Sequence, residues 1–475
     1  MYERALDWAI QHTSAKTERT RLTRITHGAI TGGPVTIWWV CVLATNGATL
    51  SLSLHCSIHH KTMRATLFVV ALIALLGRAL YERAQTVGAF RKPNTFHAAG
   101  EIKVIPDTIN AEDLHLDHAS GLIFAAAHDR DGGRSKWFPP LTRFGEPQSI
   151  LEHGGGLRVI DPTTFKTTRL ELKGFDAPFS THGIDTVRDP EQQDAIYILA
   201  VNHLPTTEYL QTLDATAPVK AASRIEIFHH VIGTDIATHV RSVEHDLVKM
   251  PNDIFAISPF AFYVTNDHHY REGPLRTVEV LGTKRFAGWS TTVYVEADET
   301  KNGADGVQAK VALTGLHNNN GLGHTPNVST ILINDAAGGV TYTARIKEDR
   351  TLEVVHEFPL PITIDNPFWF TDPYPSVDHD ASGVVNAGLT QGIKLEKELD
   401  IAEGAIAPSV FLTSGLGRGQ LNTTLLFEDD GNVLRSASAA VLIAIDPKKN
   451  EGKKQGWLFV SGFASKAAVA VKVDL

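Results

Sequence analysis

Hydrophobic and polar positions alternate in short runs along most of the chain. From about residue 96 onward, runs rich in Val, Ile, Tyr, Phe and Thr are bounded by Gly, Pro, Asn and Asp, which is typical of β-strands separated by turns. The clearest runs are 121–127, 156–160, 195–201, 224–228, 260–265, 290–295, 329–333, 409–413, 439–445 and 456–462. Amphipathic helices are scarce, and the best candidate is the short segment 114–119. The pattern predicts an all-β chain, either a β-propeller or a large sandwich.

A weak internal repeat favours the propeller. Three strand-like runs end in a similar polar tip, AVNH (200–203), VTND (264–267) and LIND (332–335), although their spacing is too uneven for a WD-type signature. No linker divides the remainder, so we expect a single β domain over residues 96–475. The segment 128–156 is rich in Gly and Pro and long for a connection, and long loops of this kind often cover functional sites.

The N-terminal part carries a targeting signal at residues 63–85. Met63 and Arg64 precede an apolar run that ends at Arg78; the run is shorter than the ~20 residues of a spanning helix but has the length of a signal-peptide core. We expect a signal peptide or an uncleaved anchor on the secretory pathway, and a retained segment would associate with a membrane. Residues 1–62 fit this poorly. Our hypothesis is that translation starts at Met63, and the alternative is a genuine disordered or membrane-proximal extension.

Composition excludes some classes of function. The chain has 53 acidic and 44 basic residues and a formal net charge of -9, so it lacks the basic footprint of a nucleic-acid-binding protein. An acidic excess also suits a protein that binds a hard cation. Cys41 and Cys56 are its two cysteines, so residues 96–475 cannot contain a disulfide. Glycosylation sequons at 327–329 and 422–424 are compatible with a secreted glycoprotein.

Candidate metal ligands gather at four places beside strand-like runs or turns. These are Glu112-Asp113, Asn252-Asp253, Asn318-Asn319-Asn320 and Asp365-Asn366. Calcium takes 6–8 oxygen ligands from carboxylates, amides and backbone, and a propeller brings distant strand ends to one central channel. Adjacent residues on an extended strand point to opposite faces, so neighbours can serve two ions. The alternative is that each pair only caps a turn, which is a common role of Asn and Asp.

Taken in order, these pairs and the segments 181–205, 250–270, 318–321 and 363–367 resemble the paraoxonase/arylesterase family, and the resemblance runs from about Met63 to Leu475. It implies a six-bladed β-propeller whose central tunnel holds two calcium ions, with activity on aryl esters and lactones. For the catalytic ion it implies the ligands Glu112, Asn252, Asn320, Asp365 and Asn366. For the structural ion it implies Asp113, Asp253 and the backbone carbonyl of Ile184.

Two histidines match the family's catalytic dyad, His182 in THGID and His203 in AVNHLP. A histidine with a pKa near 6.5 accepts a proton from water at neutral pH, and a second histidine orients it. The alternative is two core histidines bonded to backbone. We also expect His268 near the pocket and His269 facing outward. Other motifs fail: the Gly-rich turn after His153 lacks a partner G-x-S-x-G, and 128–134 lacks two ligands of an EF-hand.

The chain also departs from the family. The animal enzymes close the propeller with a disulfide, but the end of this chain, 468–475, has no Cys, so strand pairing alone must close the ring unless the anchor region helps. Residues 373–408 match the family poorly, so substrate preference does not transfer. We predict a calcium-dependent hydrolase of small carboxylic esters, either aryl esters or lactones. The alternatives are a non-catalytic, calcium-stabilised binding or scaffold propeller and an enzyme similar to gluconolactonase or strictosidine synthase.

Overall fold

The computed structural model describes residues 25–31, 36–41, 77–97, 100–377, 379–401, 403–416 and 420–475. The chain forms two compact units, Met1–Arg78 and Ala79–Leu475. In the first unit, β1 (Ile25–Thr31) pairs antiparallel with β2 (Thr36–Cys41). The expected signal or anchor at 63–85 lies outside the described residues up to position 76, and residues 77–86 are helical. Where the chain is described, none of its helices combines the length and apolar character needed to cross a membrane.

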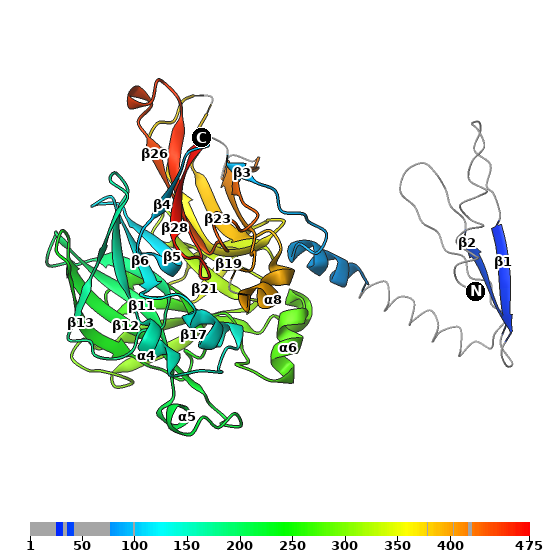
Figure 1. Cartoon of the computed structure of the whole chain (residues 1–475), viewed down its shortest axis with the longest axis horizontal. Helices are drawn as coiled ribbons and strands as arrows, with labels where there is room; N and C mark the ends of the chain where they lie inside the picture. The colour runs from blue at the N-terminus through cyan, green and yellow to red at the C-terminus, as the bar shows by residue number, and fades with distance from the viewer. Residues whose placement is uncertain are drawn as a thin grey trace. The chain divides into compact units, whose positions relative to one another are not determined.

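The second unit is a six-bladed β-propeller, as the sequence predicts (Figure 1). Blade one contains β5 (Ile109–Asp117), β6 (Leu122–His128), β7 (Gly155–Asp161) and β8 (Lys166–Arg169). Blade two contains β10 (Thr181–Arg188), β11 (Ala195–Pro205), β12 (Ala221–Val231), β13 (Ile236–Val243) and the parallel edge strand β9 (Glu171–Lys173). Blade three contains β14 (Pro251–Ser258), β15 (Ala261–Asn266), β16 (Ser290–Ala297) and β17 (Val307–Leu316).

The remaining three blades follow the same antiparallel order. Blade four contains β18 (Asn319–His324), β19 (Thr330–Asp335), β20 (Val340–Ile346) and β21 (Leu352–Pro359). Blade five contains β22 (Thr363–Phe370), β23 (Gly383–Leu389), β24 (Pro408–Ser414), β25 (Asn422–Glu428) and β3 (Phe96–His97). Blade six contains β26 (Ala439–Ile445), β27 (Gln455–Ser461), β28 (Ala468–Asp474) and β4 (Ile102–Ile105). All ten runs expected as strands lie in these blades, and the polar tips at 200–203, 264–267 and 332–335 belong to the second strands of blades two, three and four.

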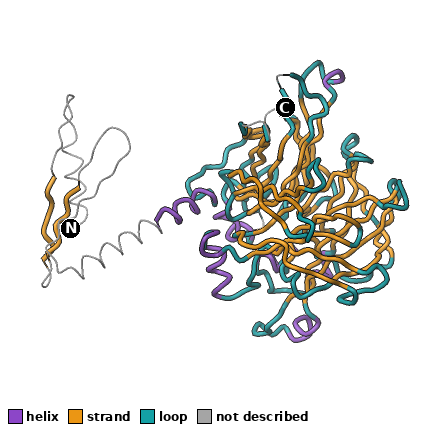
Figure 2. Tube along the Cα trace, turned by 180° about the vertical axis from the view of Figure 1, so that it is seen from behind, coloured by secondary structure: helices purple, strands orange, loops and turns teal. Residues whose placement is uncertain are grey.

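Helices are few and short in the second unit (Figure 2). Besides the helical residues up to 86, they are α3 (Gly133–Lys136), η1 (Pro139–Leu141), α4 (Ser149–His153), α5 (Thr207–Thr212), α6 (Pro274–Leu281), α7 (Lys284–Ala287), η2 (Gly392–Lys394), α8 (Leu395–Leu399) and η3 (Pro447–Lys449). The helix expected at 114–119 is wrong, because residues 114–117 continue strand β5. The reason is visible in the sequence LHLD, whose period of two suits a strand better than a helix.

Strand pairing closes the ring, as expected. The first strands of the blades contact one another in the order β5, β10, β14, β18, β22 and β26, and β26 contacts β5 again. In blade six the N-terminal strand β4 pairs with β28, with Ala468 opposite Ile105. Because the first and last parts of the domain share one sheet, opening the ring requires breaking a full strand ladder.

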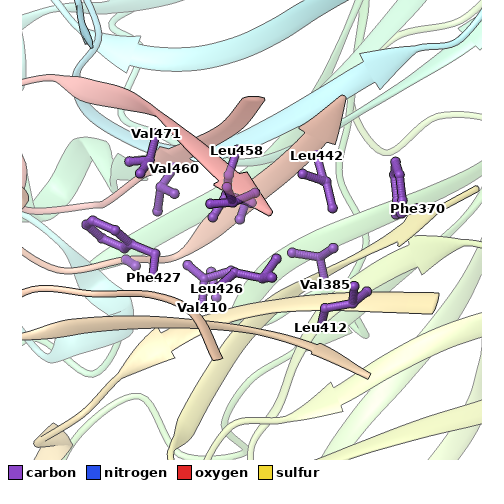
Figure 3. Close-up of a cluster of buried hydrophobic side chains, with 14 of the residues drawn as sticks. Phe370, Val385, Val410, Leu412, Leu426, Phe427, Leu442, Leu458, Val460 and Val471 are labelled. Atoms are coloured by element: carbon purple, nitrogen blue, oxygen red, sulfur yellow. The ribbon is translucent and has the colours of Figure 1, made fainter. Parts of the chain in front are cut away.

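The hydrophobic cores lie between neighbouring blades. Figure 3 shows the largest of them, in which Val385, Val410 and Phe427 of blade five face Leu442, Leu458 and Val471 of blade six. Similar clusters join blades six and one, one and two, two and three, and three and four. Burying one such side chain stabilises the fold by about 1.5–3 kcal/mol. The cores thus fix the blades rigidly around a central channel.

Candidate metal and catalytic site

The predicted ligands sit where the innermost strands change register. Five of these strands, β5, β10, β14, β18 and β22, carry a β-bulge against their second strand. The bulges span 109–113, 181–184, 251–254, 319–322 and 364–367, and therefore contain Glu112, His182, Asn252, Asn320, Asp365 and Asn366. Strand β26 pairs without a shift and carries no predicted ligand. A bulge re-aims side chains out of the regular pleat, so simple alternation does not set the directions of these neighbours.

All five ligands expected for the catalytic ion present a buried oxygen without a hydrogen-bond partner. These atoms are Glu112 Oε2, Asn252 Oδ1, Asn320 Oδ1, Asp365 Oδ1 and Asn366 Oδ1. Buried polar atoms are nearly always paired in folded proteins, so five unpaired acceptors in one tunnel are unusual. The set contains only carboxylate and amide oxygens, which are the ligands that calcium prefers. The residues present therefore fit a hard divalent cation.

The buried carboxylates in this region also lack enough positive charge. Burial raises the pKa of Glu112 well above its usual value, and repulsion from Asp365 and Asp113 raises it further. Burial and repulsion from Asp113 likewise raise the pKa of Asp365. The guanidinium of Arg134 opposes both shifts. A divalent cation among these oxygens would offset the repulsion between the carboxylates, which Arg134 alone does not cancel.

Asp113 and Asp253, the residues expected at the structural ion, differ in that their oxygens are hydrogen-bonded. Asp113 accepts the backbone N–H of Leu114 at 2.8 Å and that of Ile184 at 3.0 Å. Asp253 accepts the backbone N–H of Ile254 at 2.7 Å and that of Leu322 at 2.6 Å. Burial nevertheless raises the pKa of Asp113 to about 6, and that of Asp253 rises with it. Each carboxylate oxygen keeps a second acceptor position, which leaves room for an ion.

Two glycines allow the strands to approach closely at the site. A Cβ on Gly183 would lie 2.5 Å from the carbonyl oxygen of Asn252 and 2.6 Å from Oδ1 of Asp253. A Cβ on Gly321 would overlap Oδ1 and Cα of Asn366. Since no side chain fits in either place, these glycines bring the ligands of neighbouring blades together.

His182 and His203 form a hydrogen-bonded pair beside the ligand oxygens. Nδ1 of His182 lies 3.0 Å from Nε2 of His203, whose Nδ1 lies 2.8 Å from Oγ of Ser223. The other nitrogen of His182, Nε2, is 3.9 Å from Oε1 of Glu112. Burial lowers the pKa of His203 to about 3 and lowers that of His182 well below its usual value; neighbouring cationic groups add to both shifts. Both rings are therefore neutral at physiological pH.

A cavity of about 110 Å³ opens over His182. Phe138, Pro140 and Leu141 of the 128–156 segment form part of its wall, so this segment covers the site as expected. The ring of Phe138 packs edge-on against His182 at 4.9 Å, and Nε1 of Trp137 donates to the carbonyl of His203 at 2.8 Å. The 128–156 segment thus holds the dyad in place and supplies an apolar wall.

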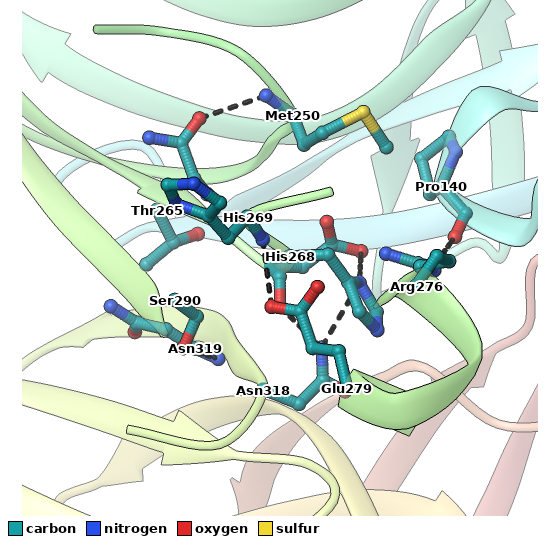
Figure 4. Close-up of polar contacts among 12 residues, drawn as sticks. Pro140, Met250, Thr265, His268, His269, Arg276, Glu279, Ser290, Asn318 and Asn319 are labelled. Carbon is teal, nitrogen blue, oxygen red and sulfur yellow. Dashed lines mark hydrogen bonds and ion pairs between the residues drawn. The ribbon is translucent and has the colours of Figure 1, made fainter. Parts of the chain in front are cut away.

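The segment after β15 supplies another part of the wall (Figure 4). His268 lines the cavity and His269 is exposed, which confirms the expectation for both. Nδ1 of His268 lies 3.2 Å from Oδ2 of Asp267, and the Asn318 side chain donates to the backbone carbonyl of Asp267 at 2.8 Å. In the same region Glu279 accepts the backbone N–H of His269 at 2.7 Å. The wall is therefore a connected polar network.

Two residues at the site were not anticipated. Asp267 lines the cavity with an unpaired Oδ1, and burial raises the pKa of its carboxyl to about 6. Arg134 is 2% exposed, and its Nε and Nη1 have no hydrogen-bond partner. Its guanidinium lies 4.3 Å from the ring centroid of Phe138. The pair Asn266-Asp267 was a visible signal for the first residue, whereas only the fold of the 128–156 segment brings Arg134 to the tunnel.

Comparisons with known proteins find a family model, curated relatives and solved structures that resemble this chain. A family model described as Arylesterase matches residues 152–443. Serum paraoxonase/arylesterase 2 of Gallus gallus is 26% identical over 383 residues, covering 78% of this chain and 93% of the relative. The Homo sapiens protein of the same name is 28% identical over 301 residues, covering 62% of this chain and 74% of the relative. Among solved structures, the calcium-binding protein regucalcin from Agrobacterium tumefaciens aligns with a TM-score of 0.38 at 11% identity, covering 78% of this chain and 94% of that one.

Proposed function

The chain belongs to the arylesterase family, whose model matches residues 152–443, and from this premise we propose that it is a calcium-dependent hydrolase of small carboxylic esters, either aryl esters or lactones. The observation that carries the proposal is the set of five unpaired, buried carboxylate and amide oxygens beside a histidine pair. Glu112, Asn252, Asn320, Asp365 and Asn366 would hold the catalytic ion. Calcium, when bound there, supplies a Lewis acid that polarises the ester carbonyl.

The histidine pair provides the base. Nδ1 of His182 is occupied by His203, so Nε2, which lies near Glu112 Oε1, is left to take a proton from water. When Nε2 of His182 is free to accept a proton, Nδ1–H of His182 donates to Nε2 of His203, and Nδ1–H of His203 donates to the hydroxyl of Ser223. This chain of hydrogen bonds orients the base and stabilises the imidazolium form of His182.

The pocket wall sets what reaches the base. Its lining includes the apolar side chains of Phe138, Leu141, Leu389 and Phe463, and the cavity of about 110 Å³ is small. We expect it to take an aromatic ring or a short acyl chain next to the ester group, because apolar pockets bind groups of matching size and exclude water.

A second calcium ion belongs to the proposal. Asp113, Asp253 and the carbonyl of Ile184 would hold it. Burial raises the pKa of both carboxylates, and repulsion from neighbouring carboxylates adds to it, which supports a cation there. Its role would be structural, because each of these carboxylates bonds the backbone of a neighbouring blade.

We further propose that the protein follows the secretory route. The apolar run ending at Arg78 and the names of the serum relatives support it, and both sequon residues, Asn327 and Asn422, are exposed. The segment 63–85 would serve as signal or anchor.

The proposal is tested by measuring hydrolysis of phenyl acetate and a panel of lactones with protein of known calcium content. We expect activity with calcium present, its loss in excess chelator, and its recovery when calcium is restored. Full activity after complete removal of calcium would contradict the proposal. A calcium-loaded protein that hydrolyses none of these substrates would instead point to a scaffold or binding role.

A further inference from the structure

The central tunnel has a second end with different chemistry. On the inner strands β5, β10, β14, β18 and β22, earlier residues line the cavity just described, and later residues line another cavity of about 320 Å³. On β5 the change occurs between Glu112 and Asp113, and on β18 it occurs between Asn320 and Leu322. The second cavity therefore lies at the other end of the same tunnel. It borders the proposed calcium ligands Asp113, Ile184 and Asn366, and its other lining residues have no part in the proposed hydrolysis.

Three metal-binding side chains from three blades meet in this second cavity. They are His115 of β5, Asp185 of β10 and His324 of β18, and one ligand atom from each lies within 4.8 Å of the others. Nδ1 of His115 is 2.9 Å from Oδ1 of Asp185, and Nε2 of His324 is 2.7 Å from Oδ2. We propose that these three residues form a zinc site that is separate from the calcium sites.

The positions of the ligands suit zinc. Zn–N bonds are ~2.0–2.1 Å and Zn–O bonds ~2.0–2.2 Å, so ligand atoms of a tetrahedral site lie ~3.4 Å apart. The two nitrogen–oxygen distances of 2.9 and 2.7 Å reach this value after a shift of about 0.5–0.7 Å. Two imidazoles and one carboxylate form a ligand set known from zinc enzymes. Calcium is disfavoured here because it takes oxygen ligands.

The cluster is also held in place before any ion arrives. The two carboxylate oxygens of Asp185 accept the backbone N–H of Thr186 at 2.7 Å and that of Ala256 at 2.6 Å, one on each oxygen. The remaining acceptor position of each oxygen faces an imidazole. The ring of His324 stacks on Phe255 at 4.2 Å with an interplanar angle of 24°. Such outer contacts orient ligands and raise metal affinity.

An ion can reach the cluster and complete its coordination there. The side chain of Asp185 is 1% exposed, but that of His324 is 41% exposed and that of His115 is 22% exposed. His118 lines the same cavity and stacks on Phe368. The fourth zinc position would thus face the cavity, where water or His118 fills it. The rival explanation is a purely hydrogen-bonded His–Asp–His bridge.

The test is a zinc titration of the full-length, calcium-loaded protein without a histidine tag, with a chromophoric chelator as competitor. We expect one tightly bound zinc per chain in addition to calcium. His324→Gln should raise the Kd for zinc on the order of 100-fold or more. Loss of a residue that only contacts a metal ligand already weakens binding by about 10–100-fold, and loss of a ligand should cost at least as much. The matched control is His229→Gln, because His229 pairs with a single carboxylate, Asp189, at 2.9 Å; this variant should bind zinc like the wild type.

Cobalt gives a second measurement. Co²⁺ in the wild-type protein should show the strong visible absorption of a tetrahedral site, and His115→Gln should abolish it. Wild-type protein that binds no zinc, or a Kd unchanged in His324→Gln, would overturn the inference. Both measurements are made without substrate, so they stand or fall independently of ester hydrolysis.

Discussion

Removing calcium should make the stability of this protein depend steeply on pH. The carboxyl of Asp113 is buried, and its pKa is raised from 3.8 to about 6 when no cation is present. A raised carboxyl pKa means that the folded state holds the proton more tightly than the unfolded state does. The free energy of unfolding of the metal-free protein is therefore highest below pH ~4 and falls as the pH rises from ~4 to ~6.

The size of the effect follows from the shift. A difference of about two pKa units at 1.36 kcal/mol each amounts to about 3 kcal/mol lost above pH ~6. Glu112, Asp253 and Asp365, whose pKa values are raised in the same direction, add to the loss. Calcium bound at the proposed sites should remove the dependence, because a cation favours the ionised carboxylates.

The assay is denaturant unfolding between pH 4.5 and 8, in chelator and in excess calcium. We expect the stability difference between the two conditions to widen as the pH rises. Between pH 4.5 and 8, Asp113→Asn should reduce the pH-dependent loss in chelator by about 2 kcal/mol, yet make the calcium-loaded protein less stable than the wild type. The control is Asp235→Asn, at an exposed position in the turn between β12 and β13. If calcium stabilises the protein equally at pH 5 and pH 8, the carboxylates are not forced together by the fold.

Three further predictions concern the site. His182→Gln should lower kcat by ~10²–10⁴-fold while calcium content, measured by mass spectrometry, stays unchanged; wild-type turnover would remove His182 from the mechanism. Because burial lowers the pKa of His182, the base stays deprotonated to lower pH, and the acid limb of kcat/KM should lie below pH ~6.5; a limb above that value would contradict the assignment. Gly321→Ala should destabilise the protein by ~1–3 kcal/mol and weaken calcium binding, because the added Cβ overlaps Asn366. The control is Gly145→Ala, because a Cβ added there would lie 4.0 Å from the nearest atom. This variant should leave both the stability and the calcium affinity unchanged.

Much of the fold could be predicted because strand signals are local. Alternating runs bounded by Gly and Asn mark strands from a few residues, and each expected strand is present. The error at 114–119 shows the limit of this reasoning: four residues of clear alternation were read as part of a short helix. The bulges were not predictable, because a bulge depends on how two strands register. The pairs Asn252-Asp253 and Asp365-Asn366 nevertheless mark their positions.

Contacts between residues distant in the chain were harder to predict. Arg134 lies in a segment that carries no periodic pattern, and its position beside Glu112 depends on the path of that segment over the tunnel. His115 and His324 are far apart in sequence, and although each follows one of the candidate-ligand motifs, only the ring of inner strands brings them to Asp185. In a propeller, the residues at one channel level come from every blade, so sequence spacing carries little information about such sites.

The bulges explain why metal binding and ring stability should be coupled. Asp113, Asp185 and Asp253 repeat one arrangement, in which each carboxylate accepts its own following N–H and one N–H from the next blade. These bonds join blade one to two, two to three, and three to four. Two of the three carboxylates are also proposed calcium ligands, and the third would bind zinc. Each ion would therefore bind where two blades meet. Its loss should lower the stability of the ring as well as remove the chemical role of the ion.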